Sequence, residues 1–294
     1  MKTTVYEYCN VERNLSQDSL STFLDSCGLT VKNFGYQTEM PYVCPRIYGD
    51  LELIYLLSGD GILNIDGKTY HGKAHDMFIL PKHSVCSFNN PGDPFENYYI
   101  HIDINDPIGE SQLKYLFHDP LLKLGEDPCL MQYYRLMEQY YQNGVPGCYM
   151  AINSILQLIL IRVIYLSGAY NNTRKIYEKY NPNSNQYQIL KQSIELVTDK
   201  KGVITVSELC REMFVSPSYM RRIFQNMLGQ SLQSFISSVR IHEAEKMLLN
   251  TSKPISEIAL LLGFSSPYHL SNDFKKYHGV SPNKYRKLMF QNQQ

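Results

Sequence analysis

The chain has 294 residues, of which 28 are basic and 28 acidic, so its formal net charge is zero. This length predicts two domains, each with enough residues to bury a core. A neutral chain would argue against nucleic-acid binding, but the charge is unevenly divided. Residues 188–294 contain 14 Lys or Arg and 8 Asp or Glu, a net charge of +6, and residues 1–187 carry −6. This asymmetry indicates a nucleic-acid-binding face in the C-terminal part.

The cysteines and the apolar stretches indicate where the protein acts. Its seven cysteines are odd in number and form no Cys-x-x-Cys pair, as expected for reduced thiols in the cytoplasm. The N-terminus lacks the apolar core of a signal peptide. The most apolar run, residues 150–170, is interrupted by Asn153, Gln157 and Arg162. We therefore expect a helix buried in protein, a cytoplasmic location and no membrane partner.

The N-terminal half begins with a weakly patterned segment, residues 1–35, that predicts an arm with one short strand or helix. Short apolar runs bounded by turn residues then predict strands at 51–58, 61–65, 68–71, 77–80, 84–88 and 97–104. Asp66-Gly67 between two of these runs is a strong hairpin signal. The spacing predicts a small antiparallel β-barrel or jelly roll.

After Asp106 the pattern becomes helical. It predicts a helix over 112–124 that breaks near Asp119-Pro120, a second over 130–142 and a third over 148–166. The third is apolar on more than one face, which exceeds what a single contact with the barrel requires. Residues 168–186, rich in Asn, Lys and Tyr, predict a linker. The chain thus divides into an N-terminal domain (1–167), a linker (168–186) and a C-terminal domain (187–294).

The C-terminal domain contains one pattern twice. Residues 206–210 and 255–259 match at an offset of 49, and later positions match at an offset of 50. The later matches are Ser216-Pro217 with Ser266-Pro267, Met220 with Leu270, Phe224 with Phe274, Gly229 with Gly279 and Ser231 with Ser281. Two units in register over about seventy-five residues indicate an internal repeat.

Each unit predicts two short helices joined by a tight turn. Ser207 and Ser216 are the expected N-caps in the first unit, with Phe214-Val215 as its turn. In the second unit Ser256 precedes the first helix and Ser266 caps the second. This plan is a helix-turn-helix, in which the second helix enters the major groove of DNA.

The units are joined by residues 231–250, which predict one unbroken helix. Twenty residues span about 30 Å along a helix. One turn of B-DNA advances about 34 Å. Two recognition helices held at this separation suit successive major-groove faces, so the sequence predicts a tandem reader of duplex DNA.

These residues resemble the AraC/XylS-type transcription regulators over roughly 190–288. The matching positions are Ser216, Pro217, Phe224, Gly229, Arg240, Ala244, Leu248, 255–259, Gly263, Phe264, 274–276, Gly279, Ser281, Pro282, Tyr285 and Arg286. The resemblance implies DNA contacts from Ser218, Arg221, Arg222 and Gln225 in the first unit and from Tyr268, Ser271, Asn272 and Lys275 in the second. Asn272 stands where the family usually has Arg, so this unit is expected to contact adenine or phosphate instead of guanine. Arg240 is expected either to brace the units or to hold a phosphate.

The N-terminal half resembles, more loosely, the cupin-like sensor domain of the same family. A metal-binding cupin needs a His-x-His pair and a later His, but 62–65 contain none and Cys86 occupies the later position. We therefore expect no metal, no cofactor, no catalytic residue and no enzymatic activity. The resemblance implies an effector site at Arg46, Phe88, Asn97 and Tyr99, whose polar groups and aromatic rings suit a sugar.

The predicted fold is α+β, with a cupin-like β-barrel and flanking helices followed by an all-α domain. The predicted function is a sequence-specific transcription regulator that responds to a small metabolite, with a sugar as the leading candidate. Its expected partners are promoter DNA, RNA polymerase and a second copy bound through residues 148–166. Two alternatives remain: a constitutive regulator whose barrel is only a dimerisation scaffold, and a cupin-type enzyme fused to a DNA-binding domain.

Overall fold

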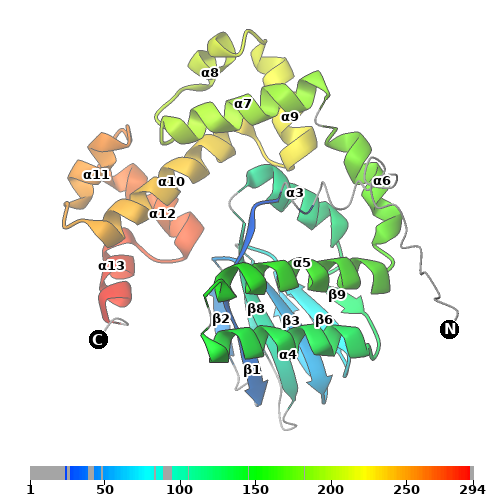
Figure 1. The fold of residues 1–294 in the computed structure, drawn as a ribbon. Coiled ribbons are helices and arrows are strands. Elements are labelled where there is room, and N and C mark those ends of the chain that lie inside the picture. The colour runs from blue at the N-terminus through cyan, green and yellow to red at the C-terminus, as the bar shows by residue number, and fades with distance from the viewer. Residues whose placement is uncertain are drawn as a thin grey trace, which may run out of the picture.

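The computed structural model describes residues 24, 27–38, 43–47, 49–82, 84–88, 95–104, 106–144, 146–181 and 183–291. Two antiparallel sheets with helices on one side form the N-terminal part, and the C-terminal part is helical (Figure 1). The predicted α+β class with two domains is confirmed.

The nine described strands form two sheets. The first has the order β1 (Leu29–Thr38), β8 (Glu96–Ile104), β3 (Leu51–Ser58), β6 (Asp76–Leu80) and β9 (Leu121–Lys123). The second has the order β2 (Val43–Ile47), β7 (Val85–Phe88), β4 (Gly61–Ile65) and β5 (Lys68–Gly72). The predicted hairpin is confirmed, because Asp66 and Gly67 take positive φ values of 49° and 82° between β4 and β5.

The described strands do not close into the predicted β-barrel, whereas the predicted alternative, a jelly roll, also consists of two packed sheets. No hydrogen-bonded pair of these strands joins the two sheets, and β1, β9, β2 and β5 are sheet edges. The sheets instead enclose a buried apolar layer that includes Ile54, Leu56, Leu63, Phe78 and Phe88. Packing two inner faces together removes these side chains from water without closing the hydrogen-bond network.

Helix α3 (Pro107–Leu116) lies between β8 and β9 in the chain, and helices α4 (Pro128–Asn143) and α5 (Cys148–Leu166) follow β9. In Figure 1 α4 and α5 lie across this sheet. Tyr134 of α4 is fully buried and stacks on Tyr55 and Tyr98 at ring-centroid distances of 5.9 and 4.7 Å. The outer face of the sheet is therefore covered, and its inner face is left for the second sheet.

The predicted helix over 112–124 is wrong in its second half. Helix α3 ends at Leu116, and after Pro120 the chain forms β9, which pairs with β6. The Asp119 carboxylate accepts a hydrogen bond from the Leu121 N–H at 3.0 Å. The Ile79 N–H donates to the Pro120 carbonyl at 2.8 Å. The residues after the break in the helix therefore pair with the sheet.

The segment predicted as a linker contains α6 (Tyr170–Lys179), and α7 (Asn185–Asp199) begins within its last residues. Ile176 and Tyr180 are each 2% exposed, so α6 is held by burial on one side. Helix α6 contacts α3. The connection between the two domains is thus packed against the sensor domain.

The C-terminal domain contains both predicted helix-turn-helix units. The first comprises α8 (Val206–Glu212) and α9 (Pro217–Leu228), and the second comprises α11 (Ile255–Leu261) and α12 (Pro267–His278). Helix α10 (Leu232–Asn250) joins them and α13 (Pro282–Gln291) follows. In Figure 1 α10 runs from the first unit to the second as a single rod, which confirms the predicted joining helix.

The N-caps agree with the prediction for α9 and α12 but not for the first helix of either unit. Ser216, Ser231 and Ser266 each accept a backbone N–H at the start of their helices. Helix α8 is capped by Thr205, whose reciprocal bonds with Glu208 form a capping box, so the predicted Ser207 cap is wrong. Ser256 lies inside α11, which starts after Pro254 with no side-chain cap.

Candidate nucleic-acid interface and sensor site

The first recognition helix, α9, has one buried and one exposed face. Pro217 occupies its first turn, and Ser216 Oγ accepts the Tyr219 N–H at 3.2 Å. Met220 and Phe224 are fully buried. All four predicted DNA-contact residues of this helix are exposed, namely Ser218, Arg221, Arg222 and Gln225. The guanidinium of Arg222 lies 5.1 Å from the centroid of the Tyr219 ring, which orients it along the helix surface.

The second recognition helix, α12, repeats this division. Leu270 and Phe274 are fully buried, and Ser266 Oγ accepts the His269 N–H at 3.2 Å. The predicted contact residues Tyr268, Asn272 and Lys275 are exposed, and Ser271 is half-buried. Tyr268 keeps 70% of its surface exposed, so its ring is available to a partner.

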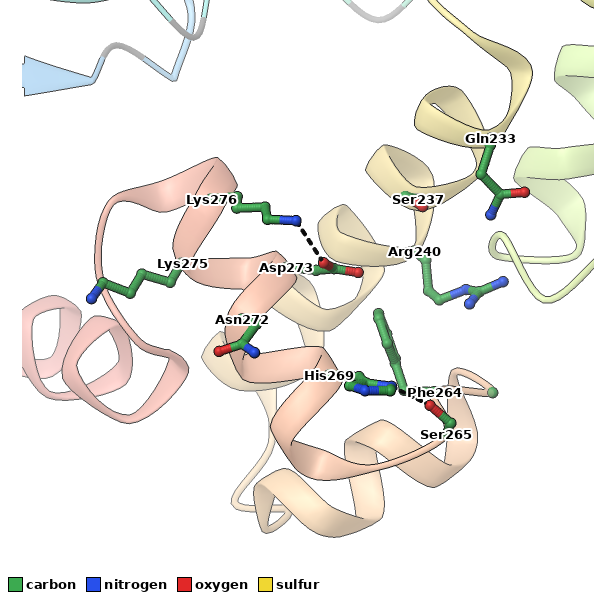
Figure 2. A pocket seen from close by; sticks show the side chains of 11 residues that line it. Gln233, Ser237, Arg240, Phe264, Ser265, His269, Asn272, Asp273, Lys275 and Lys276 are labelled. Carbon is green, nitrogen blue, oxygen red and sulfur yellow. Dashed lines mark hydrogen bonds and ion pairs between the residues drawn. The ribbon is translucent and has the colours of Figure 1, made fainter.

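A cleft of about 830 Å³ lies between α12 and the first half of α10. Figure 2 shows Asn272 and Lys275 on one side of it and Gln233 and Ser237 on the other. The two α10 residues were not predicted, although Gln233, Ser237 and Arg240 recur at helical spacing and could have been recognised as one polar face. The cleft extends the polar surface of α12 onto the joining helix.

Arg240 connects the two units. Its Nε and one terminal nitrogen donate to the Gly202 carbonyl oxygen at 3.1 and 2.7 Å, just before the first unit. Its guanidinium also lies 5.2 Å from the ring centroid of Phe264, in the turn of the second unit. Burial lowers the pKa of Arg240, but a guanidinium remains charged in water. Of its two predicted roles, these contacts match the brace.

In the N-terminal domain, strand alternation decides which side chains of β8 face the second sheet. Tyr98, Ile100 and Ile102 belong to the core beneath the helices. Asn97 and Tyr99 have the opposite orientation and are directly paired with Leu56 and Ile54 of β3, which line the core between the sheets. Phe88 reaches the same core from β7. Three of the four predicted effector residues thus share one interior, while Arg46 lies on β2 opposite Cys86 and its side chain is outside the described residues.

Asn97 is the most unusual of these side chains. It is fully buried, and neither its amide nitrogen nor its amide oxygen makes a hydrogen bond with a described residue. An unpaired buried amide costs about 1–3 kcal/mol, so its presence requires an explanation.

A charged group lies farther along the same face of β8. His101 Nδ1 is 3.0 Å from an Asp50 oxygen, and His101 Nε2 is 3.4 Å from an oxygen of Glu52, whose side chain is 2% exposed. Burial would raise the pKa of Asp50, but hydrogen bonds from His101 and Lys32 outweigh it and lower the pKa. Asp50 and Glu52 were not predicted as candidate site residues. Period-two alternation from Asn97 and Tyr99 leads to His101, which pairs with Glu52 of β3.

Among the described residues, no group of three or more His, Cys, Asp or Glu side chains is arranged to hold a metal ion.

Helix α5 carries the surface predicted for dimerisation. Its Ile159, Leu160 and Val163 are fully buried, yet its other side exposes Tyr149, Met150, Leu158, Ile161 and Tyr165. By length and composition α5 would also suffice to cross a membrane, a test that the core helix of a soluble protein passes as well. Arg162 ties it to α4 through Asp127, which is 6% exposed, with nitrogen–oxygen distances of 2.5 to 3.2 Å.

Comparison with known families matches both halves of the chain. The family profile described as AraC-like ligand binding domain matches residues 38–122, and the profile described as Helix-turn-helix domain matches residues 209–288. Together these ranges cover β2 to β8 and both recognition helices.

Three curated relatives are similar over most of their length. The Msm operon regulatory protein of Streptococcus mutans is 26% identical over 247 residues, which cover 83% of this chain and 86% of the relative. The Lactose operon transcription activator of Staphylococcus xylosus is 23% identical, and the match covers 90% of this chain and 91% of the relative. The Raffinose operon transcriptional regulatory protein of Pediococcus pentosaceus is 26% identical, and the match covers 73% of this chain and 76% of the relative.

Proposed function

The chain belongs to the AraC-type transcription regulators, a family of DNA-binding proteins, and from this premise we propose that it is a sugar-responsive regulator. In this proposal α9 and α12 bind successive major-groove faces of a promoter. A small sugar binds between the two sheets of the N-terminal domain and changes the affinity of the protein for DNA or the recruitment of RNA polymerase in the cytoplasm.

The DNA-binding part of the proposal is supported by the exposed faces of the recognition helices. In each helix the apolar residues are buried and the polar or basic ones face outward, so the side chains proposed to contact base edges are exposed in the free protein. Arg221 and Arg222 supply bidentate donors for guanine. Asn272 offers the amide pair that suits adenine. The two units are therefore proposed to read different bases.

The sugar-binding part is supported chiefly by the unpaired amide of Asn97. An amide buried without a partner in the free protein can donate to and accept from a hydroxyl group when a ligand is present. Phe88 and Tyr99 provide aromatic faces nearby, and Glu52 provides a carboxylate on the same face of the sheet. The three relatives are regulators of msm, lactose and raffinose operons, which favours a mono- or oligosaccharide.

The experiment that tests the effector is a thermal-shift screen of the full chain against mono-, di- and oligosaccharides. A ligand that binds only the folded state raises the melting temperature by mass action. One sugar is expected to give a concentration-dependent shift, and the same sugar at saturation is expected to change the affinity for a selected DNA site. No shift across the panel would favour the constitutive alternative, with the sheets serving only as a scaffold.

Asn97→Leu provides the matched variant. Because it replaces an unpaired buried amide by an apolar group of similar size, the ligand-free protein is expected to become more stable by about 1–3 kcal/mol. The same variant is expected to lose the sugar-induced shift. A variant that is destabilised and still binds the sugar would show that Asn97 has a structural role.

Dimerisation through α5 is proposed from its exposed apolar surface. A contiguous apolar patch of this kind marks an interaction surface more often than a free one. Sedimentation should show a dimer that Ile161→Asp converts to a monomer with unchanged secondary structure. A monomer in the unaltered protein would contradict the proposal.

A further inference from the structure

A cavity of about 490 Å³ lies where the sensor domain meets the first DNA-binding unit. Three segments line it: the end of α3 and the residues after it, helix α6 with its C-cap, and the last residues of α9. The lining side chains and backbone belong to Ser111, Lys114, Tyr115, His118, Asn172, Lys179, Tyr180, Leu228 and Gly229. A cavity of this volume falls within the range of small-molecule sites.

The cavity sits on a hydrogen-bonded junction between the domains. The Met227 carbonyl, in the last turn of α9, accepts from Ser111 Oγ and from the Tyr180 hydroxyl, each at 2.7 Å. The two hydroxyl oxygens are also 3.0 Å apart. Tyr180 is 2% exposed and Ser111 is half-buried, so the hydroxyl of Tyr180 is held in the interior of this junction. A molecule bound beside it would contact both domains at once.

The charge of the lining is one-sided. It contains Lys114, Lys179 and the imidazole of His118, and no Asp or Glu. Neither lysine forms an ion pair with a carboxylate among the described residues. The Lys179 ammonium lies over the Tyr115 and Tyr180 rings, 4.9 and 5.1 Å from their centroids, and its pKa is lowered by desolvation. The two ammonium groups thus lie at the same cavity. The charge of Lys114 also acts on the Glu110 carboxylate, one turn earlier on α3, whereas the pKa of Lys179 is shifted by desolvation.

The remaining lining groups are neutral hydrogen-bonding or aromatic ones. Asn172 supplies an amide, and Tyr115, which is 39% exposed, supplies a ring face and a hydroxyl. Ammonium groups bind phosphate as point charges, and an amide with an aromatic face suits a sugar ring. The cavity is also larger than a bare phosphate requires.

The geometry points to a second effector site, in which a small phosphorylated sugar binds between α3, α6 and the end of α9. Lys114 and Lys179 hold the phosphate, and Asn172 and Tyr115 contact the sugar. Such a ligand binds only the arrangement in which the sensor and the first unit are docked, so it stabilises that arrangement over others. This site is separate from the one between the sheets and does not depend on it.

The test uses isothermal titration calorimetry of the full chain with three probes: glucose 6-phosphate, glucose and inorganic phosphate. Glucose 6-phosphate is expected to bind most tightly. Lys114→Gln/Lys179→Gln is expected to raise its Kd at least tenfold. Lys175→Gln, an exposed lysine on the same helix α6 that does not line the cavity, is the matched control and should leave the Kd unchanged.

Four outcomes would overturn the inference. These are absence of glucose 6-phosphate binding at millimolar concentration, an unchanged Kd in the double variant, binding of glucose as tight as that of its phosphate, and binding of inorganic phosphate as tight as that of the sugar phosphate. If the lysines only complement the carbonyl end of α9, the double variant lowers the melting temperature of the free protein and leaves the Kd unchanged. Asn97→Leu should retain glucose 6-phosphate binding, which separates this site from the one between the sheets.

Discussion

The two helix-turn-helix units share one sequence pattern, yet they pack against different parts of the protein. In the first, Met220, Phe224 and Met227 of α9 belong to a core that continues into α3 of the sensor domain. In the second, Leu270 and Phe274 belong to a separate core formed with α10 and α11. The first unit thus packs directly against the N-terminal domain, whereas the second is attached through α10.

The second unit does not share the core of the N-terminal domain and is held by a network of polar contacts with α10 and α13. Glu245 of α10 accepts a hydrogen bond from the Tyr285 hydroxyl and lies 3.8 Å from His278 Nε2 at the end of α12. Arg286 adds hydrogen bonds to the carbonyls of Leu248 and Lys253 at 3.1 and 2.8 Å. A unit without a large neighbour is therefore held by α13 and the end of α10.

The largest expected effect concerns the contact that keeps the units in register. Gly202 has a φ of +72°, and a Cβ there would lie 2.8 Å from the Ile236 carbonyl oxygen and 2.9 Å from the Arg240 nitrogen. Gly202→Ala is expected to destabilise the protein by about 3 kcal/mol, from backbone strain and forced separation of α10. Gly229→Ala is the matched control, because its φ is +67° but nothing lies within 4 Å. It should cost only about 1–2 kcal/mol in denaturant unfolding. Equal costs would mean that α10 adjusts freely.

The next effect compares the two recognition helices on DNA. Arg222→Ala is expected to weaken binding to a selected site by about 1–3 kcal/mol and to relax specificity at one or two positions. Asn272→Ala, at the matching position of α12, is expected to relax specificity at a different position. Lys246→Ala provides the control. The Lys246 ammonium lies 2.8 Å from a Glu243 oxygen on α10, and this pair is away from either recognition helix. A uniform loss on all DNA sequences would make Arg222 a phosphate contact.

Acid should loosen the second unit before the first. Burial would raise the pKa of Glu245, but hydrogen bonds from His242 and Tyr285 and the charge of His278 lower it to about 2 from 4.5. Because the folded pKa is depressed, its contribution to stability is present above about pH 4.5 and is lost as the pH falls toward 2. Burial also lowers the pKa of His278 from 6.5. The stability that the neutral imidazole of His278 contributes is therefore lost as the pH falls below 6.5.

Hydrogen exchange measures this difference directly. Amides of α12 should lose protection at a higher pH than those of α9. Glu245→Gln should reduce the dependence on pH below 4.5. Simultaneous loss of protection in both helices would contradict the separate anchoring of the two units.

The smallest effect lies in the turns. Phe214 has a φ of 54° and is 95% exposed, while the matching residue of the second unit is Gly263, with a φ of 66°. A bulky residue in this region is strained, so Phe214→Gly should stabilise the first unit by up to about 1 kcal/mol. Gly263→Phe should destabilise the second unit by about 1–2 kcal/mol. If Phe214→Gly instead lowers the melting temperature, the ring has a contact in solution that supports it.

Local chemistry explains which features could be predicted from sequence. Ser216-Pro217 and Ser266-Pro267 each predict an N-cap and the first turn of a helix from two adjacent residues. Asp66-Gly67 predicts a hairpin in the same way. Thr205 could have been found, because Thr-x-x-Glu up to Glu208 is a capping box, but the nearby Ser207 was preferred. These features depend on neighbours in the chain.

The features that could not be predicted depend on distant partners. Whether the strands close into a barrel is decided by which edges pair, and the partners of β1 lie in β8, far along the chain, from Leu29 with Ile104 to Thr38 with Glu96. That Asn97 lacks a partner follows from what surrounds it in three dimensions. The hydrogen bonds from Ser111 and Tyr180 to Met227 join three elements whose docking has no local signal.

Selection of DNA sites from random sequence, followed by footprinting of the full chain on the selected duplex, tests the central claim most directly. Each protomer is expected to protect two major-groove segments about one helical turn apart. Arg222→Ala should remove one segment and Asn272→Ala should weaken the other. Protection of a single segment, or failure to select any sequence, would contradict a tandem reader in which both units bind DNA.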